Sequence, residues 1–419
     1  MGKNWKGAVS LIIAAAMALT LPGWQAAAGQ EFAYGAVTSK SRTTAEEELH
    51  GVWISYLDWN EWPKDEENFQ KTVDKVMDEC ALWGMNAVFV HVRSHGDSMY
   101  PSSCYPWSKF ASGQQGNPLP YDPLAYMIAA AHERGMQFHA WFNPYRITGY
   151  QMKWEEVSDK SPAKKWLSDN NAANDRNVLC HQGEYYYNPA SEDVKNLVVN
   201  GVMEVVNGYD VDGVHFDDYF YPQVDDTKEA LWFDKPEYLA SGSAQPIAQW
   251  RRDQVSDLVK RVYDSIKQKK PGVLFGISPQ GYLKNLRSDN KLFVDVDRWM
   301  TSDGYVDYIM PQIYWGFEAR TSDGSEAPYA FSANLKSWAE LKKKGGVRLY
   351  LGLGLYRAGT NVKDNNDSSE WLRRNDIIKR QVEEGRENGA VSGYCFYAYR
   401  SFREAAAQGE IGNLLPLLK

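Results

Sequence analysis

The sequence predicts an α/β protein with a (β/α)8 TIM barrel, and three observations lead to that prediction. Eight short apolar runs alternate with eight longer amphipathic segments after residue 48. Polar or aromatic residues follow each apolar run, as expected where parallel strands end at one rim. The alternating part of the chain, 49–419, has about 370 residues, which suits a single barrel domain with long loops at the C-terminal face of its strands.

The predicted strands are apolar runs of strand length that are bounded by polar or turn-forming residues. In order they are Gly51–Tyr56, Ala87–Val92, Phe138–Phe142, Gly213–Asp217, Leu274–Ser278, Val306–Met310, Leu349–Leu353 and Gly393–Tyr397.

The predicted helices carry apolar residues at spacings of three and four, which places those residues on one face. In order they are Asn68–Trp83, Leu124–Arg134, Ala190–Val206, Ile247–Lys267, Leu292–Met300, Ala333–Lys343, Trp371–Asn388 and Arg403–Leu418. Gly84, Gly135 and Gly389 follow three of these segments, in the position where glycine ends a helix.

The N-terminus has the order of a secretory signal peptide. Lys3 and Lys6 precede the apolar run 8–21, and Ala26–Ala28 supplies small residues for cleavage. We therefore expect a signal at 1–28, a polar linker at 29–48 and a secreted or extracytoplasmic protein. The apolar run is shorter than the roughly 20 residues of a membrane-spanning helix, and an uncleaved signal anchor is the alternative.

Composition narrows the classes of partner and cofactor. The formal net charge is −8, and no basic face is visible, which argues against nucleic acid as a partner. The four cysteines lack metal-ligand or redox spacing, and only Cys104 and Cys180 fall in predicted loops, where a disulfide is conceivable. The 16 Trp and 26 Tyr exceed the needs of a core, and aromatic faces stack on sugar rings.

The segment Asp210–Pro222 carries the strongest chemical signal. Strand alternation places His215 and Asp217 on one side of the predicted fourth strand, and Asp218 follows directly. Active sites of this fold lie at these strand ends, which favours a catalytic role for both aspartates. The alternative is that they cap the next helix or hold a structural cation.

Other polar and aromatic clusters follow the predicted strands at the same rim. They are Arg93–Asp97, Asn143–Arg146, Gln312–Trp315, Glu318 and Tyr356–Arg357. Long segments after the second, third, fourth and sixth strands would form walls around them, which favours an elongated substrate such as a polysaccharide.

Cleavage of a glycosidic bond uses two carboxyl groups, and few carboxylates stand at these strand ends. Asp217 with Glu318 or Asp97 would satisfy a retaining or an inverting arrangement. A third route uses adjacent acids and the acetamido oxygen of an N-acetyl sugar, and Asp217–Asp218 suits that route best. The predicted catalytic residues are Asp217, Asp218 and Glu318; a solvated loop position is the alternative for Glu318.

Substrate contacts are expected from polar and aromatic residues at the strand ends. The predicted substrate-binding residues are Arg93, Asp97, Asn143, Arg146, His215, Tyr219, Gln312, Tyr314 and Trp315. Structural salt bridges for the arginines, a turn for Asp97 and core packing for Tyr314 are the alternatives. His91 and His215 lack a third ligand for a metal, and no cofactor motif is visible, so no metal or cofactor is predicted.

Several segments together resemble the bacterial glycosyl-hydrolase-like family ten. The segments are Val92–Tyr100, His139–Arg146, Tyr209–Pro222, Phe275–Pro279 and Met310–Trp315. The resemblance implies a (β/α)8 barrel of an exported or envelope protein. It also implies similarity to peptidoglycan glycosidases that act on glycan strands stripped of stem peptides, with Asp217 and Asp218 at the acidic centre.

The sequence thus favours a secreted glycoside hydrolase of N-acetylated glycan strands. Two alternatives stay open: a glycosidase of another polysaccharide, and a barrel that binds glycan without cleaving it. A substrate panel and an assay for reducing ends separate the three.

Overall fold

The computed structural model describes residues 47–222, 233–342, 346–360 and 369–419. The predicted signal peptide and all but the last two residues of the predicted linker lie outside these ranges. Among the described helices, none combines the length and the apolar character needed to cross a membrane.

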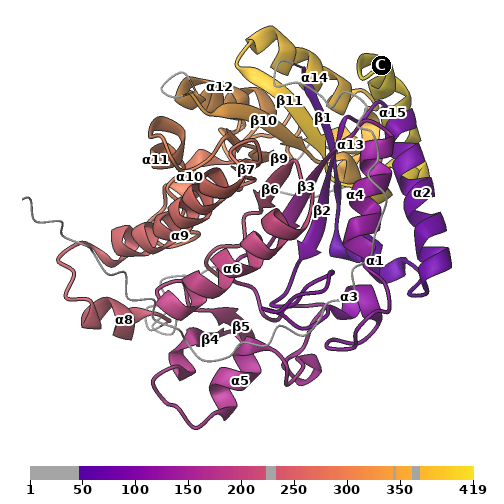
Figure 1. Cartoon of the computed structure of the whole chain (residues 1–419). Helices are drawn as coiled ribbons and strands as arrows, with labels where there is room; N and C mark the ends of the chain where they lie inside the picture. The colour runs from indigo at the N-terminus through magenta and orange to yellow at the C-terminus, as the bar shows by residue number, and fades with distance from the viewer. Residues whose placement is uncertain (1–46, 223–232, 343–345, 361–368) are drawn as a thin grey trace, which may run out of the picture. The chain divides into compact units, whose positions relative to one another are not determined.

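Eight parallel strand positions close into a barrel, as the sequence predicts (Figure 1). The strands are β1 (Leu49–Ile54), β2 (Ala87–Arg93), β3 (Gln137–Phe142), β6 (Gly213–Phe216), β7 (Leu274–Ile277), β8 (Tyr308–Ile309), β10 (Arg348–Leu353) and β11 (Val391–Phe396). Closure follows because β11 pairs with both β10 and β1. Strand β9 (Gln312–Ile313) resumes the line of β8 after Pro311 and pairs with β10.

Helices surround the strands and mostly follow them in the alternation that the sequence predicts. The longer ones are α2 (Glu66–Leu82), α4 (Pro123–Glu133), α6 (Glu192–Gly208), α9 (Ile247–Lys269), α12 (Phe331–Lys342) and α14 (Ile377–Asn388). The short ones are α1 (Tyr56–Glu61), α3 (Lys109–Ser112), α5 (Pro162–Ser168), α8 (Lys235–Ala240), α10 (Leu283–Leu286), α11 (Val296–Thr301), α13 (Glu370–Arg373) and α15 (Gln408–Leu414).

Capping explains several helix boundaries. The Asp65 and Ser191 side chains accept hydrogen bonds from backbone N–H groups in the first turns of α2 and α6. Gly84, Gly135 and Gly389 adopt positive φ angles of 80°, 75° and 72°, which glycine tolerates at no steric cost. The predicted helix ends at these glycines are therefore confirmed.

Three predicted elements differ from the structure. The predicted helix over 371–388 is interrupted between α13 and α14, where Arg374 and Asp376 form an ion pair in the connection. The predicted final helix consists of 3₁₀ turns and the short α15. The sixth strand is split into β8 and β9 because Pro311 between them has no N–H to donate.

The loop after β3 contains an antiparallel hairpin. The sequence predicts only that this loop forms part of the wall around the site. The hairpin joins β4 (Val178–His181) to β5 (Glu184–Tyr187). Cys180 lies on β4 with an exposed side chain, while Cys104 lies in a segment bound to Glu204 of α6. Both thiols are free, so the suspected disulfide is not formed in the structure.

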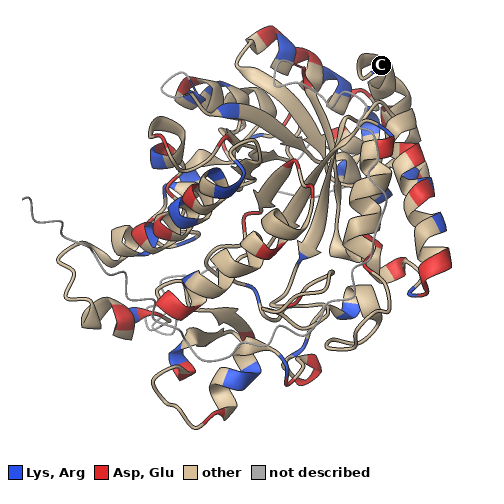
Figure 2. Cartoon of the chain, in the orientation of Figure 1, with Lys and Arg blue, Asp and Glu red and all other residues tan. Residues whose placement is uncertain are grey.

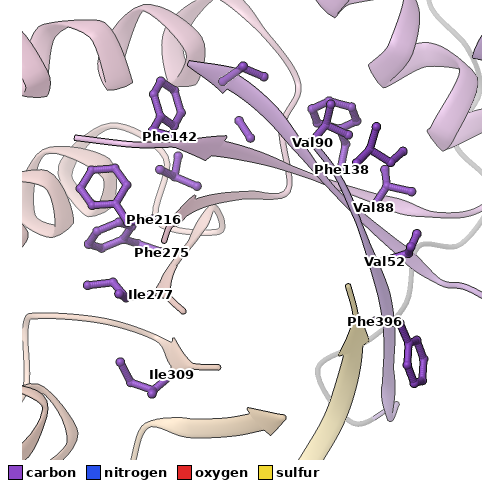
Figure 3. Packing of buried hydrophobic residues seen from close by; sticks show 14 of the residues in the cluster. Val52, Val88, Val90, Phe138, Phe142, Phe216, Phe275, Ile277, Ile309 and Phe396 are labelled. Atoms are coloured by element: carbon purple, nitrogen blue, oxygen red, sulfur yellow. The ribbon is translucent and has the colours of Figure 1, made fainter. Parts of the chain in front are cut away.

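Strand alternation divides the apolar residues into two sets. Outward residues such as Val52, Val88 and Phe138 pack against the helices, in the cluster seen in Figure 3. Inward residues such as Trp53 and Tyr308 fill the barrel with aromatic rings. The barrel interior is therefore a packed core. Its uppermost side chains lie under a cavity at the C-terminal ends of the strands.

Charged residues of both signs are interspersed along the outer helices (Figure 2). Between α6 and α9, Lys195 donates to Asp257 over 2.8 Å, and Arg261 contacts Glu192 over 2.7 Å. The Lys195 side chain is almost fully buried, so its two carboxylate partners compensate for the loss of water.

The absence of a side chain at Gly276 is a steric requirement of the barrel interior. A Cβ atom there would lie 2.1 Å from the Tyr308 ring, whereas one at Gly272, before the same strand, would meet nothing within 4 Å. We expect Gly276→Ala to lower the free energy of unfolding by about 1–3 kcal/mol through overpacking. Gly272→Ala should change it by no more than about 0.5 kcal/mol. Urea unfolding measures both, and equal values for the two variants would contradict this account.

Candidate active site

A cavity of about 210 Å³ opens at the C-terminal ends of the barrel strands. Its lining residues are Trp53, Tyr56, His91, Trp141, Arg146, Asp217, Asp218, Tyr219, Ser278, Gln312, Tyr314, Tyr356 and Tyr397. These residues follow or end seven of the eight strand positions and β9, so the cavity is a product of the whole barrel.

Asp217 lies directly after β6 and is only 3% exposed. Its Oδ2 accepts a hydrogen bond from Trp141 Nε1 over 3.0 Å, and its Oδ1 accepts from the Tyr219 backbone N–H over 3.1 Å. Asn143 Nδ2 donates to both oxygens, over 3.1 and 3.3 Å. These donors replace the water that burial removes from the Asp217 carboxylate, and they fix its orientation.

Asn143 links this anion to the loop that follows β3. The side chain is fully buried, and while its amide nitrogen donates to Asp217, its Oδ1 accepts from the backbone N–H of Arg146 over 2.9 Å. Asn143 does not line the cavity. The structure therefore gives it a positioning role where the sequence analysis predicted a substrate contact.

Asp218 faces the cavity beside Asp217 in a different environment. Burial, and secondly the negative charge of Asp217, raise the pKa of Asp218 to about 7. Hydrogen bonding by Gln312 and the charge of Arg146 oppose this rise. Two adjacent carboxylates cannot both ionise cheaply, so the pair shares a proton at and below neutral pH, and we assign that proton to Asp218.

Arg146 brings a half-buried cation to the cavity. Its Nε donates to the Ser94 carbonyl over 3.0 Å, and its guanidinium lies over the rings of Tyr219 and Tyr56 at 4.9 and 5.4 Å. Among the described residues, no carboxylate lies within 4.0 Å of it as an ion-pair partner. The positive charge of Arg146 therefore lowers the pKa of Asp218 from across the cavity, without an ion pair to either aspartate.

Aromatic rings form the other walls. Tyr314 and Tyr397 stack with centroids 5.9 Å apart, and Tyr356 meets both rings edge-on. The ring centroids of Trp53 and Tyr397 lie 6.0 Å apart. Such faces and hydroxyls suit the apolar faces and hydroxyl groups of sugar rings.

Besides Asn143, three predicted substrate-binding residues lie buried below or beside the cavity. His215 is fully buried, accepts from Trp53 Nε1 over 3.2 Å and contacts the Tyr308 hydroxyl over 3.0 Å. Burial keeps its pKa well below the usual range, so it is a neutral part of the core. Arg93 is buried beneath the rim, donates to the Asn143 carbonyl and stacks on Tyr105.

Asp97 is the third of these residues, and its Oδ2 accepts from Gln115 over 3.0 Å. Burial raises the pKa of Asp97 to about 6. Arg93 and Asp97 are both almost fully enclosed by protein and do not line the cavity. The geometry therefore does not support direct substrate contact for either.

Glu318 and Trp315 also lie away from the cavity lining. Glu318 forms an ion pair with Arg373, and its backbone N–H donates to Glu370 over 2.9 Å. Trp315 packs against Tyr329 with centroids 5.8 Å apart. The loop after β9 packs closely at Gly316, where the Glu370 carboxylate would crowd any side chain, and Glu318 follows it outside the cavity lining.

The structure adds residues that the site prediction left out. They are Trp53, Tyr56, His91, Trp141, Ser278, Tyr356 and Tyr397. Most are aromatic. Trp53, His91 and Trp141 lie within strands, and their inward orientation follows from strand alternation. What the sequence did not reveal is their height along the barrel axis, which separates core residues from cavity residues.

Comparisons with known proteins identify the family of this chain. Residues 48–372 match the family described as glycosyl hydrolase-like 10. The chain belongs to this family. It is 34% identical over 362 residues to the glycosyl hydrolase YngK of Bacillus subtilis, across 81% of this chain and 67% of that protein. It is 32% identical over 370 residues to the glycosyl hydrolase DigH of Escherichia coli, across 80% and 79% of the two chains.

Solved structures with the same fold include carbohydrate-active enzymes. The glycoside hydrolase domain of PgaB (BpsB) from Bordetella bronchiseptica matches with a TM-score of 0.55 and 15% identity, over 88% of this chain and 99% of that one. The catalytic domain of a β-amylase from Paenibacillus polymyxa matches with a TM-score of 0.55 and 11% identity, over 90% and 100%. At such identities the likeness shows the barrel fold alone.

Within the described ranges, no group of three or more His, Cys, Asp or Glu side chains is arranged to hold a metal ion.

Measuring the pKa of the Asp218 carboxyl is a direct test of the electrostatics of this cavity. We expect a value of about 7 by carbon NMR of the side-chain carboxyl. Asp217→Asn should lower it, because a negative neighbour is removed, and Arg146→Gln should raise it, because a cation is removed. Arg146→Lys keeps the charge and serves as the control. A wild-type value near the ordinary 3.8 of aspartate would contradict the assignment.

Proposed function

We propose that the protein is a secreted or extracytoplasmic glycoside hydrolase of N-acetylated glycan strands, with peptidoglycan freed of stem peptides as its substrate. One observation carries the proposal. A single cavity holds a carboxylate bound by three donor groups beside a second carboxyl whose pKa is raised to about 7. Glycosidases use such a division between an anionic and a protonated carboxyl.

Asp218 is the general acid in this proposal. It transfers its proton to the glycosidic oxygen as the bond from that oxygen to the anomeric carbon breaks. The acetamido oxygen of the sugar attacks the anomeric carbon, and Asp217 accepts a hydrogen bond from the acetamido N–H and stabilises the positive charge. Water then attacks the anomeric carbon, gives a proton to Asp218 and releases the sugar with its acetamido group restored.

The surroundings support this assignment of roles. Hydrogen bonds from Trp141 and Asn143 fix the orientation of the Asp217 carboxylate, so it can face the acetamido group without reorganising. The tyrosine walls offer surfaces for neighbouring sugar rings. The peptidoglycan substrate rests on the family resemblance, and the extracytoplasmic location rests on the predicted signal peptide.

Substitution of the aspartates tests the proposal. Asp218→Asn and Asp217→Asn should each lower kcat on peptide-stripped, N-acetylated strands by roughly 10²–10⁴-fold, because proton transfer or charge stabilisation is lost. Glu318→Gln, a carboxylate of the same rim outside the cavity lining, should retain wild-type activity. The measurement is the release of reducing ends.

Three results would contradict the proposal. Equal activity of all variants would remove the aspartates from the reaction. Binding of glycan by the wild-type protein without any release of reducing ends would leave a binding barrel. Release only from polysaccharides that lack N-acetyl groups would replace the substrate class and the acetamido step.

The pH dependence of kcat/KM follows from the protonation of Asp218. The acid must carry its proton at the start of the reaction, so activity should fall as pH rises through about 7. Arg146→Gln should move this alkaline limb to higher pH, because Arg146 lowers the pKa of Asp218. Rates that rise steadily from about pH 6 to about pH 8, roughly one unit either side of that pKa, would show that Asp218 is not the acid.

A further inference from the structure

His91 is a cavity residue with an unused hydrogen-bond donor. It lies on β2, inside the barrel, and only 1% of its surface is exposed. Its Nε2 atom lies 3.8 Å from Asp217 Oδ2 and has no hydrogen-bond partner in the structure. A buried polar atom without a partner is costly, so its presence in the cavity lining points to a group that binds there.

The hydrogen bonding of the ring fixes which nitrogen carries the proton. The backbone N–H of Tyr56 donates to Nδ1 over 3.3 Å, so Nδ1 is the acceptor. Burial lowers the pKa of His91 to about 4, so the ring is neutral at neutral pH. The single ring proton is therefore on Nε2, which can donate a hydrogen bond into the cavity.

Packing fixes the direction of that donor. The His91 ring stacks on Trp141 with centroids 3.3 Å apart and an interplanar angle of 17°. Tyr56 contacts the ring at a centroid distance of 5.5 Å. Because Trp141 also donates to Asp217, the same indole orients both the imidazole and the carboxylate.

The distance between the two groups suits one shared oxygen atom. His91 Nε2 lies 3.8 Å from Asp217 Oδ2, which is too long for a direct hydrogen bond. An oxygen at a usual hydrogen-bond distance of about 2.8 Å from each atom fits between them. That oxygen has to accept from an N–H and donate to a carboxylate, and a hydroxyl group does both.

We infer that His91 and Asp217 together bind one hydroxyl oxygen during the reaction, either a hydroxyl of the sugar at the cleavage point or the attacking water. A cation is disfavoured by the N–H, and an anion by the carboxylate, which leaves a neutral hydroxyl. The inference rests on the proposed glycosidase function and deepens it, because it adds a contact that selects the substrate or orients the water.

Two variants separate the donor from the ring. His91→Phe keeps an aromatic ring for Trp141 and removes the donor, whereas His91→Gln keeps an N–H donor and removes the ring. Binding of a peptide-stripped, N-acetylated tetrasaccharide is measured by calorimetry in the Asp218→Asn background, with kcat measured in the presence of Asp218. Thermal unfolding confirms that each variant is folded, since His91→Phe also leaves the Tyr56 N–H without its acceptor.

The two sources of the hydroxyl predict different results. If it belongs to the sugar, His91→Phe weakens tetrasaccharide binding about tenfold, the effect of losing one hydrogen bond, and His91→Gln restores part of it. If it belongs to the water, binding is unchanged and kcat falls about tenfold in His91→Phe but less in His91→Gln.

Other results would overturn the inference. Folded His91→Phe that binds and cleaves like the wild type would show that the donor is not used. Equal losses in His91→Phe and His91→Gln would show that the intact imidazole matters for packing alone. Failure of the proposed function looks different, because the wild-type protein itself would then release no reducing ends from the tetrasaccharide.

Discussion

The buried carboxylate of Asp217 is the constraint on which the site depends. A buried carboxylate among aromatic rings is stable only if hydrogen-bond donors of the protein replace the water molecules that it loses on burial. Trp141 and Asn143 supply them from β3 and the loop that follows it, and the backbone of Tyr219 supplies another. These groups meet because β3 and β6 are paired neighbours, with Trp141 opposite His215 in register.

The state of Asp218 follows from that arrangement. Once Asp217 is held as an anion, a second negative charge on the next residue is unfavourable, and burial adds to the penalty. Arg146 limits the shift from across the cavity, so the pKa stays within reach of neutral pH. The chain thereby places an acid and an anion side by side, although both residues are aspartates.

The barrel layers beneath the cavity keep this arrangement rigid. Trp53, a cavity residue, donates to His215, which contacts the Tyr308 hydroxyl in the core. Tyr308 in turn contacts His139 over 3.3 Å. These buried hydrogen bonds connect Trp53 in the cavity lining to the interior of the barrel. Glycines such as Gly276 leave room there for the aromatic rings.

Much of this could be predicted from the sequence, because alternation and strand ends are local signals. They placed the barrel, Asp217, Asp218, Arg146 and Tyr314 correctly in space. These local signals did not predict how deep each side chain lies along the barrel axis. His215 points inward, as its position in the strand predicts, but it lies one layer below Asp217.

The other differences depend on tertiary contacts that no local pattern encodes. Arg93 and Asp97 are enclosed by the loops after β2 and β3, and Glu318 is drawn outward by Arg373. The free donor of His91 is apparent only from the contacts of its ring with Tyr56 and Trp141.

The most direct test of the central claim is the digestion of peptide-stripped glycan strands in water labelled with the heavy oxygen isotope, followed by mass spectrometry. Hydrolysis at the Asp217–Asp218 site predicts fragments that carry one labelled oxygen at each new reducing N-acetylated sugar, and none from the Asp218→Asn variant. Fragments without label, or the same labelled fragments from that variant, would contradict the account.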